Sequence, residues 1–389
     1  MVRIPNIKIC FYCLLLSLLF LCSGQLKAVD IFSDHDVRAL FESQLDLFHR
    51  RNDNLTESTF THLSEMWDKI YMVAVDKKTL LDSDSSPDQL QSEFFELVSS
   101  HMSSLETAVT PSRINLWVAT SVEIGGVEKT EYTSLTNFQT DGINFGISAV
   151  NLNKSLVGFS LGHGEDKTGV GTWATRSTTN DYAMSVYGSK VLSKELRLDT
   201  ALSAHKYKFE SFRQPGNALL NGKRNAHQFA GSVRLAKSFV RKNFLISSFL
   251  QADIGTTKLG SFTENNGLRP VNFSNQTLYL RRQNIGISIK HHRLTTIGVI
   301  ESVAQFEHVF DSSYSSDITA KYMGASTLDY YYTNRFKSDI FKGTLGLKIR
   351  LFSGQILARY VRTEQSEMFN GPQPNRKSDK ISLYITLDY

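Results

Sequence analysis

The last eleven residues of the chain, 379–389, read Asp-Lys-Ile-Ser-Leu-Tyr-Ile-Thr-Leu-Asp-Tyr. From Ile381 to Tyr389 every second residue is apolar or aromatic, and most of the residues between them are polar. A period of two residues predicts a β-strand with one apolar and one polar face. An apolar face on an edge strand promotes aggregation in water, whereas it is stable in contact with lipid. We therefore interpret 379–389 as the closing strand of a transmembrane β-barrel.

The same alternation recurs throughout residues 111–389, where Gly, Thr, Ser and aromatic residues are frequent. This region predicts an all-β transmembrane barrel of about twelve antiparallel strands. The candidate strands are 112–122, 141–151, 155–163, 180–191, 195–209, 225–238, 243–257, 277–290, 297–310, 339–351, 355–364 and 379–389. Each has roughly 9 to 15 residues, which is long enough to cross a membrane at a tilt.

The connections between these strands alternate in length. Long polar connections follow the odd-numbered strands, at 123–140, 164–179, 210–224, 258–276, 311–338 and 365–378. Short turns follow the even-numbered strands, at 152–154, 192–194, 239–242, 291–296 and 352–354. Long loops on one side and tight turns on the other are typical of outer-membrane barrels, whereas a soluble sandwich has no reason to alternate in this way.

The N-terminal residues 1–28 have the pattern of a signal peptide. Arg3 and Lys8 precede an apolar run at 9–21, and small residues follow it. The run is too short to span a membrane comfortably, so a cleaved signal is favoured over the alternative of an uncleaved N-terminal anchor. Together with the barrel pattern, a signal peptide predicts export to the outer membrane of a Gram-negative bacterium.

Composition excludes several classes of site. All three cysteines, Cys10, Cys13 and Cys22, lie within 1–28. A chain cleaved after Ala28 would therefore contain no disulfide and no thiolate metal site. The formal charge of +5 falls to 5 − 3 = +2 without the three basic residues of 1–28, which gives no support to nucleic-acid binding.

Residues 29–110 are predicted to be helical because apolar residues recur at helical spacing and Gly is absent. Apolar clusters at 40–48 and 63–71 indicate two helices within a short, passenger-like segment, 29–86. A third helix, 87–110, has the clearest start, with Ser86 as its cap and Pro87 at its first position. We expect this third helix to be a linker that plugs the pore.

Histidines near predicted strand ends are the candidates for catalysis: His163, His205, His227 and His308. A lipid-acting barrel enzyme would need one of them beside a serine and an orienting polar group. Isolated histidines in a barrel more often lie in the lumen or at the membrane interface. His291 and His292 fall in a predicted turn, where the sequence offers no third metal ligand, so we expect a solvated turn. No catalytic, metal-binding or cofactor-binding residue is assigned, and we expect no enzyme.

Six basic residues have the inward parity of pore-lining residues: Arg197, Arg234, Lys348, Arg350, Arg359 and Lys380. Two interpretations remain open. They could simply face lumen water, since the other strand face meets lipid. Alternatively, they could hold the plug helix through Glu93, Glu96 or Glu106. The aromatic residues Trp117, Tyr182, Tyr187, Tyr207, Tyr360 and Tyr389 are interpreted as an interface girdle.

Residues 112–389, about seventy per cent of the chain, resemble the autotransporter β-domain, the twelve-stranded translocator barrel of Gram-negative outer membranes. Short motifs carry the resemblance, namely Asn-Leu-Trp at 115–117, Asp-Tyr-Ala-Met-Ser-Val-Tyr-Gly-Ser at 181–189, Leu-Asp-Thr-Ala-Leu at 198–202, Phe-Glu-His-Val-Phe-Asp at 306–311 and Ile-Thr-Leu-Asp-Tyr at 385–389. The loop 260–265 is similar to esterase-type members in particular. Those members have a large passenger with a Gly-Asp-Ser-Leu motif, and no Gly-Asp-Ser occurs in 29–86, so their activity is not transferred to this chain.

The resemblance implies a helix that threads the pore before the first strand. It also implies that Ile385, Leu387 and Tyr389 belong to a terminal signal that the barrel-assembly machinery recognises. The expected function is an outer-membrane translocator or anchor of type V secretion with a very short helical N-terminal segment. The alternatives are a plugged porin-like channel and a lipid-acting barrel enzyme. The expected partners are outer-membrane lipid, the assembly machinery and periplasmic chaperones, around a monomeric barrel.

Overall fold

The computed structural model describes one helix and most of the barrel region. The described residues are 35–79, 114–130, 133–151, 155–171, 175–193, 195–213, 219–241, 243–266, 270–295, 298–313, 316–323, 330–334, 338–351, 354–367 and 375–388. The expected signal peptide, 1–28, and the expected plug helix, 87–110, lie outside these residues.

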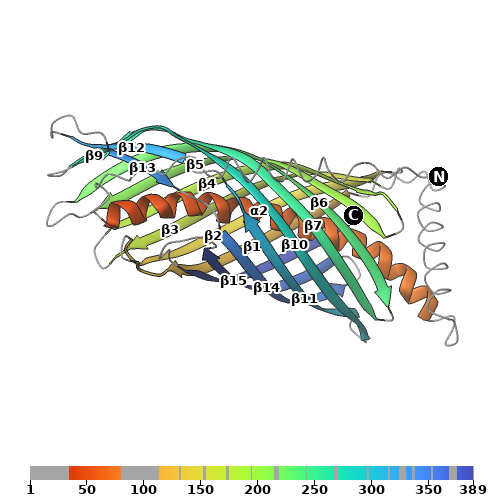
Figure 1. Cartoon of the computed structure of the whole chain (residues 1–389). Helices are drawn as coiled ribbons and strands as arrows, with labels where there is room; N and C mark the ends of the chain where they lie inside the picture. Colours follow the sequence, from red (N-terminus) through yellow and green to blue (C-terminus); the bar gives the residue numbers. More distant parts are fainter. Residues whose placement is uncertain are drawn as a thin grey trace, which may run out of the picture.

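Twelve antiparallel strands form a closed barrel (Figure 1). They are β1 (Ile114–Val127), β2 (Thr136–Asn151), β3 (Ser155–Val170), β4 (Thr175–Val191), β5 (Leu196–Arg213), β6 (Leu220–Arg241), β7 (Phe244–Leu259), β10 (Gln276–Thr295), β11 (Gly298–Asp311), β14 (Ser338–Leu351), β15 (Gly354–Glu367) and β16 (Arg376–Asp388). The first and last strands close the barrel, because β1 pairs with β16 from Asn115↔Asp388 to Val127↔Arg376. The predicted fold and number of strands are confirmed.

The strand ends differ from the prediction mainly on the side of the long loops. β3 continues to Val170, beyond the predicted end at 163, and β6 begins at Leu220 rather than at 225. In these extensions polar residues replace the alternating apolar residues, while backbone pairing continues. The predicted turn at 291–296 is also wrong for its first residues, because β10 runs to Thr295 and includes His291 and His292.

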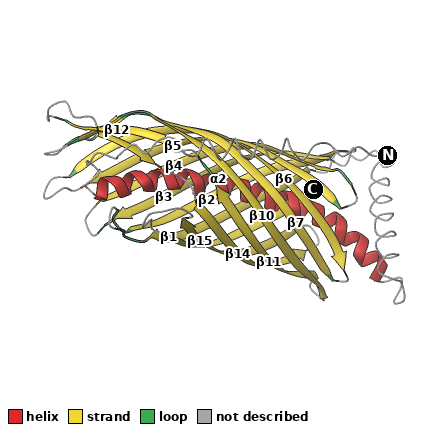
Figure 2. Cartoon of the chain, viewed as in Figure 1, coloured by secondary structure: helices red, strands yellow, loops and turns green. Residues whose placement is uncertain are grey.

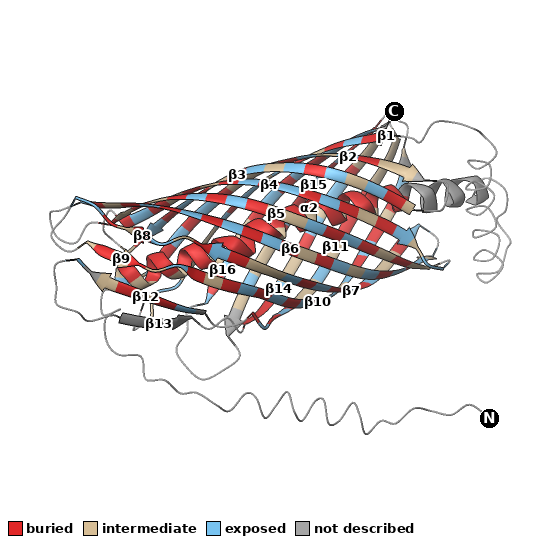
Figure 3. Cartoon of the chain, turned by 90° about the horizontal axis from the view of Figure 1, so that it is seen from above, coloured by how far each residue is buried: buried red, intermediate tan, exposed pale blue. Residues whose placement is uncertain are grey.

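The side chains of the barrel are arranged with apolar residues outside and polar residues inside. On β16, Ile381, Leu383, Ile385 and Leu387 are exposed, whereas the alternating residues between them are buried. Figure 3 shows this alternation of exposed and buried residues along the strands. Lipid solvates such an outer face, and the closed ladder satisfies the backbone polar groups inside the membrane.

A second, four-stranded sheet lies at the long-loop end of the barrel. Its strands are β8 (Phe262–Thr263), β9 (Val271–Phe273), β12 (Ser316–Tyr322) and β13 (Tyr330–Asn334), in the order β13-β12-β9-β8. These strands belong to two connections, 258–276 and 311–338, that were predicted to be long polar loops. Because they are short and lie far apart in sequence, they show no periodicity of their own. We call them the loop sheet.

One continuous helix, α2 (His35–Thr79), passes through the lumen (Figure 2). The prediction of two separate helices within 29–86 is therefore wrong, since both apolar clusters belong to α2. Among the described residues, no helix is both long enough and apolar enough to span a membrane. Instead, α2 has charged residues along its length, which suits a helix surrounded by a polar barrel lumen.

Candidate functional site: the helix in the charged lumen

The direction of α2 is fixed by contacts at its two ends. Near the start of α2, the Asp36 carboxylate accepts a hydrogen bond of 2.6 Å from Ser134, in the long connection after β1. Towards its other end, Trp67 Nε1 donates to Ser189 Oγ at 2.8 Å, close to the short turn after β4. α2 therefore runs from the long-loop end of the barrel to the short-turn end.

Apolar contacts hold the start of α2 at the long-loop end of the barrel. Phe48 packs edge-on against Tyr207, with ring centroids 4.8 Å apart, and Phe41 stacks with Phe273 of the loop sheet at 6.5 Å. Phe273 in turn stacks on Phe262 at 4.7 Å. We call this group the apolar clamp; its buried members also include Val37, Leu45, Leu47, Phe209, Ala226, Leu259, Val271, Leu278, Ile318 and Ala320.

Two consecutive arginines of α2 bind acidic residues of the barrel wall. Arg50 donates to Asp166 at 2.7 Å, and Arg51 forms an ion pair with Asp181 at 2.9 Å. Arg51 reaches the wall where β3 has Gly164: a Cβ atom at this position would lie 2.1 Å from Arg51 Cζ. The absence of a side chain at Gly164 therefore provides the space that the guanidinium occupies.

Further along α2 the signs of the charges are reversed. Asp53 accepts from Arg282 at 2.6 Å and from Lys342 at 3.0 Å. One turn later, Glu57 pairs with Arg359 at 3.2 Å and also contacts Lys380. Since Asp53 and Glu57 are four residues apart, they lie on the same face of the helix and contact neighbouring strands of the wall.

A second group of buried charges lies near the short-turn end. Glu65 of α2 accepts from Lys290 at 2.7 Å and from Lys348 at 2.6 Å, and Lys348 also contacts Glu301 at 2.6 Å. Asp68 contacts the same Lys290. We call these five residues the turn-end charge cluster. Each is no more than 6% exposed, and charges buried this deeply must be paired to be tolerated.

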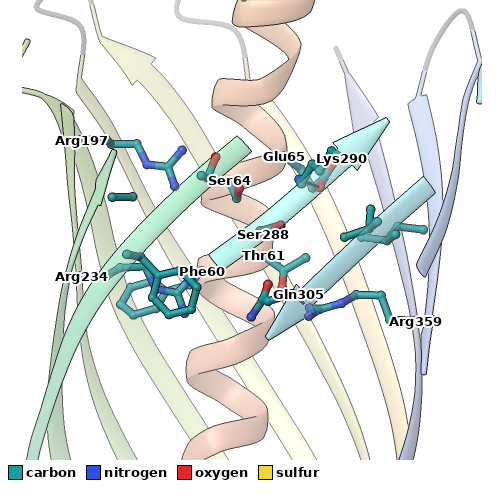
Figure 4. A pocket seen from close by; sticks show the side chains of 15 residues that line it. Phe60, Thr61, Ser64, Glu65, Arg197, Arg234, Ser288, Lys290, Gln305 and Arg359 are labelled. Atoms are coloured by element: carbon teal, nitrogen blue, oxygen red, sulfur yellow. Dashed lines mark hydrogen bonds and ion pairs between the residues drawn. The ribbon is translucent and has the colours of Figure 1, made fainter. Parts of the chain in front are cut away.

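A small cavity remains between α2 and the wall (Figure 4). Thr61, Ser64 and Glu65 face it from the helix, and the wall contributes several cationic side chains, namely Arg197, Arg234, Lys290 and Arg359. Apolar side chains such as Phe60, Phe249 and Leu357 complete the lining of this cavity.

The six predicted pore-lining residues all lie on the inner face, and four of them contact α2. Lys348, Arg359 and Lys380 bind Glu65 or Glu57, as described above, and the Arg234 guanidinium lies 4.5 Å from the centre of the Phe60 ring. Arg197 instead pairs with Asp199 on its own strand at 2.9 Å. Within the described part of the chain, Nε and Nη2 of Arg350 have no hydrogen-bond partner.

The expected helical partners of these cations, Glu93, Glu96 and Glu106, lie outside the described residues. The wall cations instead bind acidic residues of α2, which lies in the segment predicted to be passenger-like. Several further wall residues contact α2 and were not predicted: Asp166, Asp181, Arg282, Lys290, Lys342 and Arg376. Their inward parity was a usable signal, and so was the run of charges on α2 at Asp46, Arg50, Asp53, Glu57, Glu65 and Asp68.

The histidine candidates are scattered. His205 is buried in the lumen against Asp181, whereas His163 and His227 are on the outer face. His308 packs against Phe341 and contacts Asp339. His292 is not in a solvated turn but is buried, 2.7 Å from Glu301. Among the described residues, no group of His, Cys, Asp and Glu has the arrangement of a metal site.

A hydrogen bond of 2.9 Å joins His62 of α2 to Ser148 Oγ, but it is buried in the lumen. There His62 stacks on Trp117, which donates to the Tyr187 hydroxyl at 2.7 Å. Trp117, Tyr187 and Tyr207 are all buried inside the barrel. Their assignment to an interface girdle is therefore wrong, while Tyr182 and Tyr360 are exposed as expected.

The predicted terminal signal lies on the closing strand. Ile385 and Leu387 of β16 point outward, 36% and 42% exposed, and their register partners on β1 are Val118 and Leu116. Tyr389 lies outside the described residues. The two outward residues thus belong to the apolar belt at the seam that closes the barrel.

A closed barrel with an apolar outer face and a charged lumen defines the chain as a β-barrel protein of the outer membrane. A family model of the autotransporter beta-domain matches residues 116–355, more than half of the chain. The chain therefore belongs to the autotransporter beta-domain family. β15 and β16 lie almost entirely beyond the matched region, and the structure shows that they complete the same barrel.

Solved structures show the same fold. The chain is similar to the translocator domain of the autotransporter NalP from Neisseria meningitidis, with a TM-score of 0.55 and 12% identity, over 81% of this chain and 98% of that chain. It is also similar to the beta domain of the Bordetella autotransporter BrkA, with a TM-score of 0.50 and 13% identity, over 70% and 99% of the two chains. No sequence among the curated proteins matches the chain.

Proposed function

We propose that this outer-membrane autotransporter barrel is an anchor in which α2 remains in the lumen and keeps it closed. The observation that carries the proposal is the series of ion pairs between α2 and the wall, from Arg50–Asp166 to Glu65–Lys348. Each end of this series is buried, so withdrawal of the helix would leave wall charges without partners inside the barrel. The bound helix is therefore the stable state of the lumen.

The direction of α2 has a consequence for the proposed topology. With the short turns in the periplasm, the start of α2 at His35 lies at the cell-surface end. A segment that precedes α2 would then be displayed outside the cell, as an anchoring role requires. A tag inserted directly before His35 should be labelled on intact cells, whereas labelling only after permeabilisation of the outer membrane would contradict this topology.

The assembly route is also part of the proposal. We infer that a signal peptide, 1–28, is removed during export, that periplasmic chaperones deliver a monomeric chain, and that the barrel-assembly machinery recognises Ile385, Leu387 and Tyr389. The exposed apolar residues of β16 support this, because the last strand has to be inserted into lipid and paired with β1. Mass spectrometry of the mature N-terminus tests the cleavage after residue 28.

A plugged channel is the second candidate, and the cavity beside α2, which has cationic side chains on its wall side, favours it. The two candidates differ in what happens to α2: a channel must move it, whereas an anchor retains it. We further propose that the barrel has no catalytic activity. The support is that His163 and His227 lie apart on the outer face and that the His62–Ser148 pair is enclosed in the lumen. Lipase activity lost on substituting a strand histidine would contradict this.

A further inference from the structure

The outer face of three neighbouring strands has a row of basic residues near the long loops. Lys206 of β5 is the register partner of His227 on β6, which is the register partner of Lys258 on β7. All three side chains are exposed. Neighbouring strands are about 4.8 Å apart, so the row extends over roughly 10 Å.

The row lies directly beside the apolar belt. On the short-turn side of it, the outer face has large exposed apolar residues: Leu202 is 69% exposed, Phe229 68% and Ile254 65%. At the edge of the row is Tyr182, the register partner of Lys206, and Lys208 lies over its ring at 5.7 Å. An aromatic residue at the border between apolar and charged surface marks the headgroup level of a membrane.

Among the described residues, no acid neutralises the positive charge of the row. In the described part of the chain, Lys206, Lys208 and Lys258 form no ion pair. On this face of β4 to β7, at the end near the long loops, the described residues include one acid, Glu210, and it pairs with Lys223. The row therefore offers positive charge at the height where anionic lipid headgroups lie.

We propose that Lys206, His227 and Lys258 form a binding site for the phosphate groups of a phosphorylated glycolipid in the outer leaflet. The acyl chains of that lipid would lie along Leu202, Phe229 and Ile254, and Tyr182 would pack beside its sugars. A row with three basic groups suits a headgroup with more than one phosphate better than a phospholipid with a single phosphate. Long loops mark the cell-surface side, so the site faces the outer leaflet.

The test compares two double variants of the full chain, folded in detergent. Lys206→Gln/Lys258→Gln removes two charges from the row. Lys129→Gln/Lys377→Gln removes two exposed charges near β1 and β16, on the opposite side of the barrel in strand order. Heat-modifiable migration on gels verifies that each variant is folded. Diphosphorylated lipid A, its monophosphorylated form and phosphatidylglycerol are titrated, and dissociation constants are measured by thermophoresis.

We expect the row variant to bind diphosphorylated lipid A at least about tenfold more weakly, because each lysine contributes roughly one favourable charge contact to binding. The control variant should bind as the native chain does, and the native chain should bind the monophosphorylated lipid more weakly. Equal affinity of the row variant and the native chain would overturn the site. Equal affinity of the native chain for phosphatidylglycerol would overturn the assignment to a glycolipid.

Discussion

Glu65 of α2 and Lys348 of β14 lie 2.6 Å apart inside the barrel, at 3% and 1% exposure, although 283 residues separate them in the chain. This contact joins the helix to the wall where water is almost excluded. An ion pair in such a place is costly to break on one side, because the remaining charge stays buried and loses one of its partners.

Replacement of one partner should therefore destabilise the barrel. For Glu65→Gln we expect a loss of about 1.5–3 kcal/mol in the free energy of unfolding, because Lys290 and Lys348 each lose a charged partner and keep one other, Asp68 or Glu301. Denaturant unfolding of the refolded chain, followed by tryptophan fluorescence, measures it. A Glu65→Leu/Lys348→Met variant should lose less than the sum of its two single variants. Strict additivity would mean that the two residues do not interact.

Gly164 should be intolerant of even the smallest side chain. In Gly164→Ala the new methyl group would occupy the position of the Arg51 guanidinium. We expect the Arg51–Asp181 pair to be displaced, with a loss of about 1–3 kcal/mol in the free energy of unfolding. Gly169→Ala on the same strand is the matched control, since a Cβ atom there would have nothing within 4 Å. Similar unfolding curves for the two variants would contradict the packing described around Arg51.

The apolar clamp should control access to the long-loop end of α2. Phe48→Ala removes a buried ring that contacts Tyr207 and Phe209, and such a truncation costs about 3–5 kcal/mol. Hydrogen exchange of the first turns of α2 should accelerate, while exchange near Glu65 should change little. Leu202→Ala, at a lipid-facing position, is the control and should leave exchange in α2 unchanged. Acceleration along the whole helix would indicate that the two ends are not held independently.

The terminal strand should be needed for insertion. Leu387→Asn/Tyr389→Ser places polar groups in the apolar belt and in the predicted assembly signal, and we expect it to lower the amount of folded barrel in outer-membrane fractions severalfold. Thr386→Ser, which changes the lumen-facing residue next to Leu387, should assemble normally. Heat-modifiable migration reports both outcomes, and normal assembly of the double variant would rule out the signal.

The barrel could be predicted because lipid and lumen impose a period of two on every strand. This parity also identified Lys348, Arg359 and Lys380 as lumen residues. It failed at the strand ends near the long loops, where both faces are polar. Trp117, Tyr187 and Tyr207 were predicted to belong to an interface girdle near the strand ends, although their parity is inward.

The identity of the helix in the lumen was harder to obtain from the sequence. Helices are usually interpreted by their apolar face, and 87–110 has the clearer cap and stripe. In a polar lumen the charged face of a helix is also buried, so charges such as Asp53, Glu57 and Glu65 are signs of packing rather than of solvent. The partners of these charges come from strands more than 200 residues away, and that pairing depends on the register of the closed barrel.

Single-channel recording in planar bilayers tests most directly whether α2 closes the lumen through these charges. The native chain should remain closed, and Gln substitutions at Asp53, Glu57 and Glu65 combined should produce frequent openings. The wall cations that bind these three acids then lose their acidic partners on the helix, namely Arg282, Lys342, Lys348, Arg359 and Lys380. A chain without residues 35–79 sets the conductance of the open barrel. If the native chain already conducts at that level, or if the triple variant stays as closed as the native chain, α2 is not the charge-held plug described here.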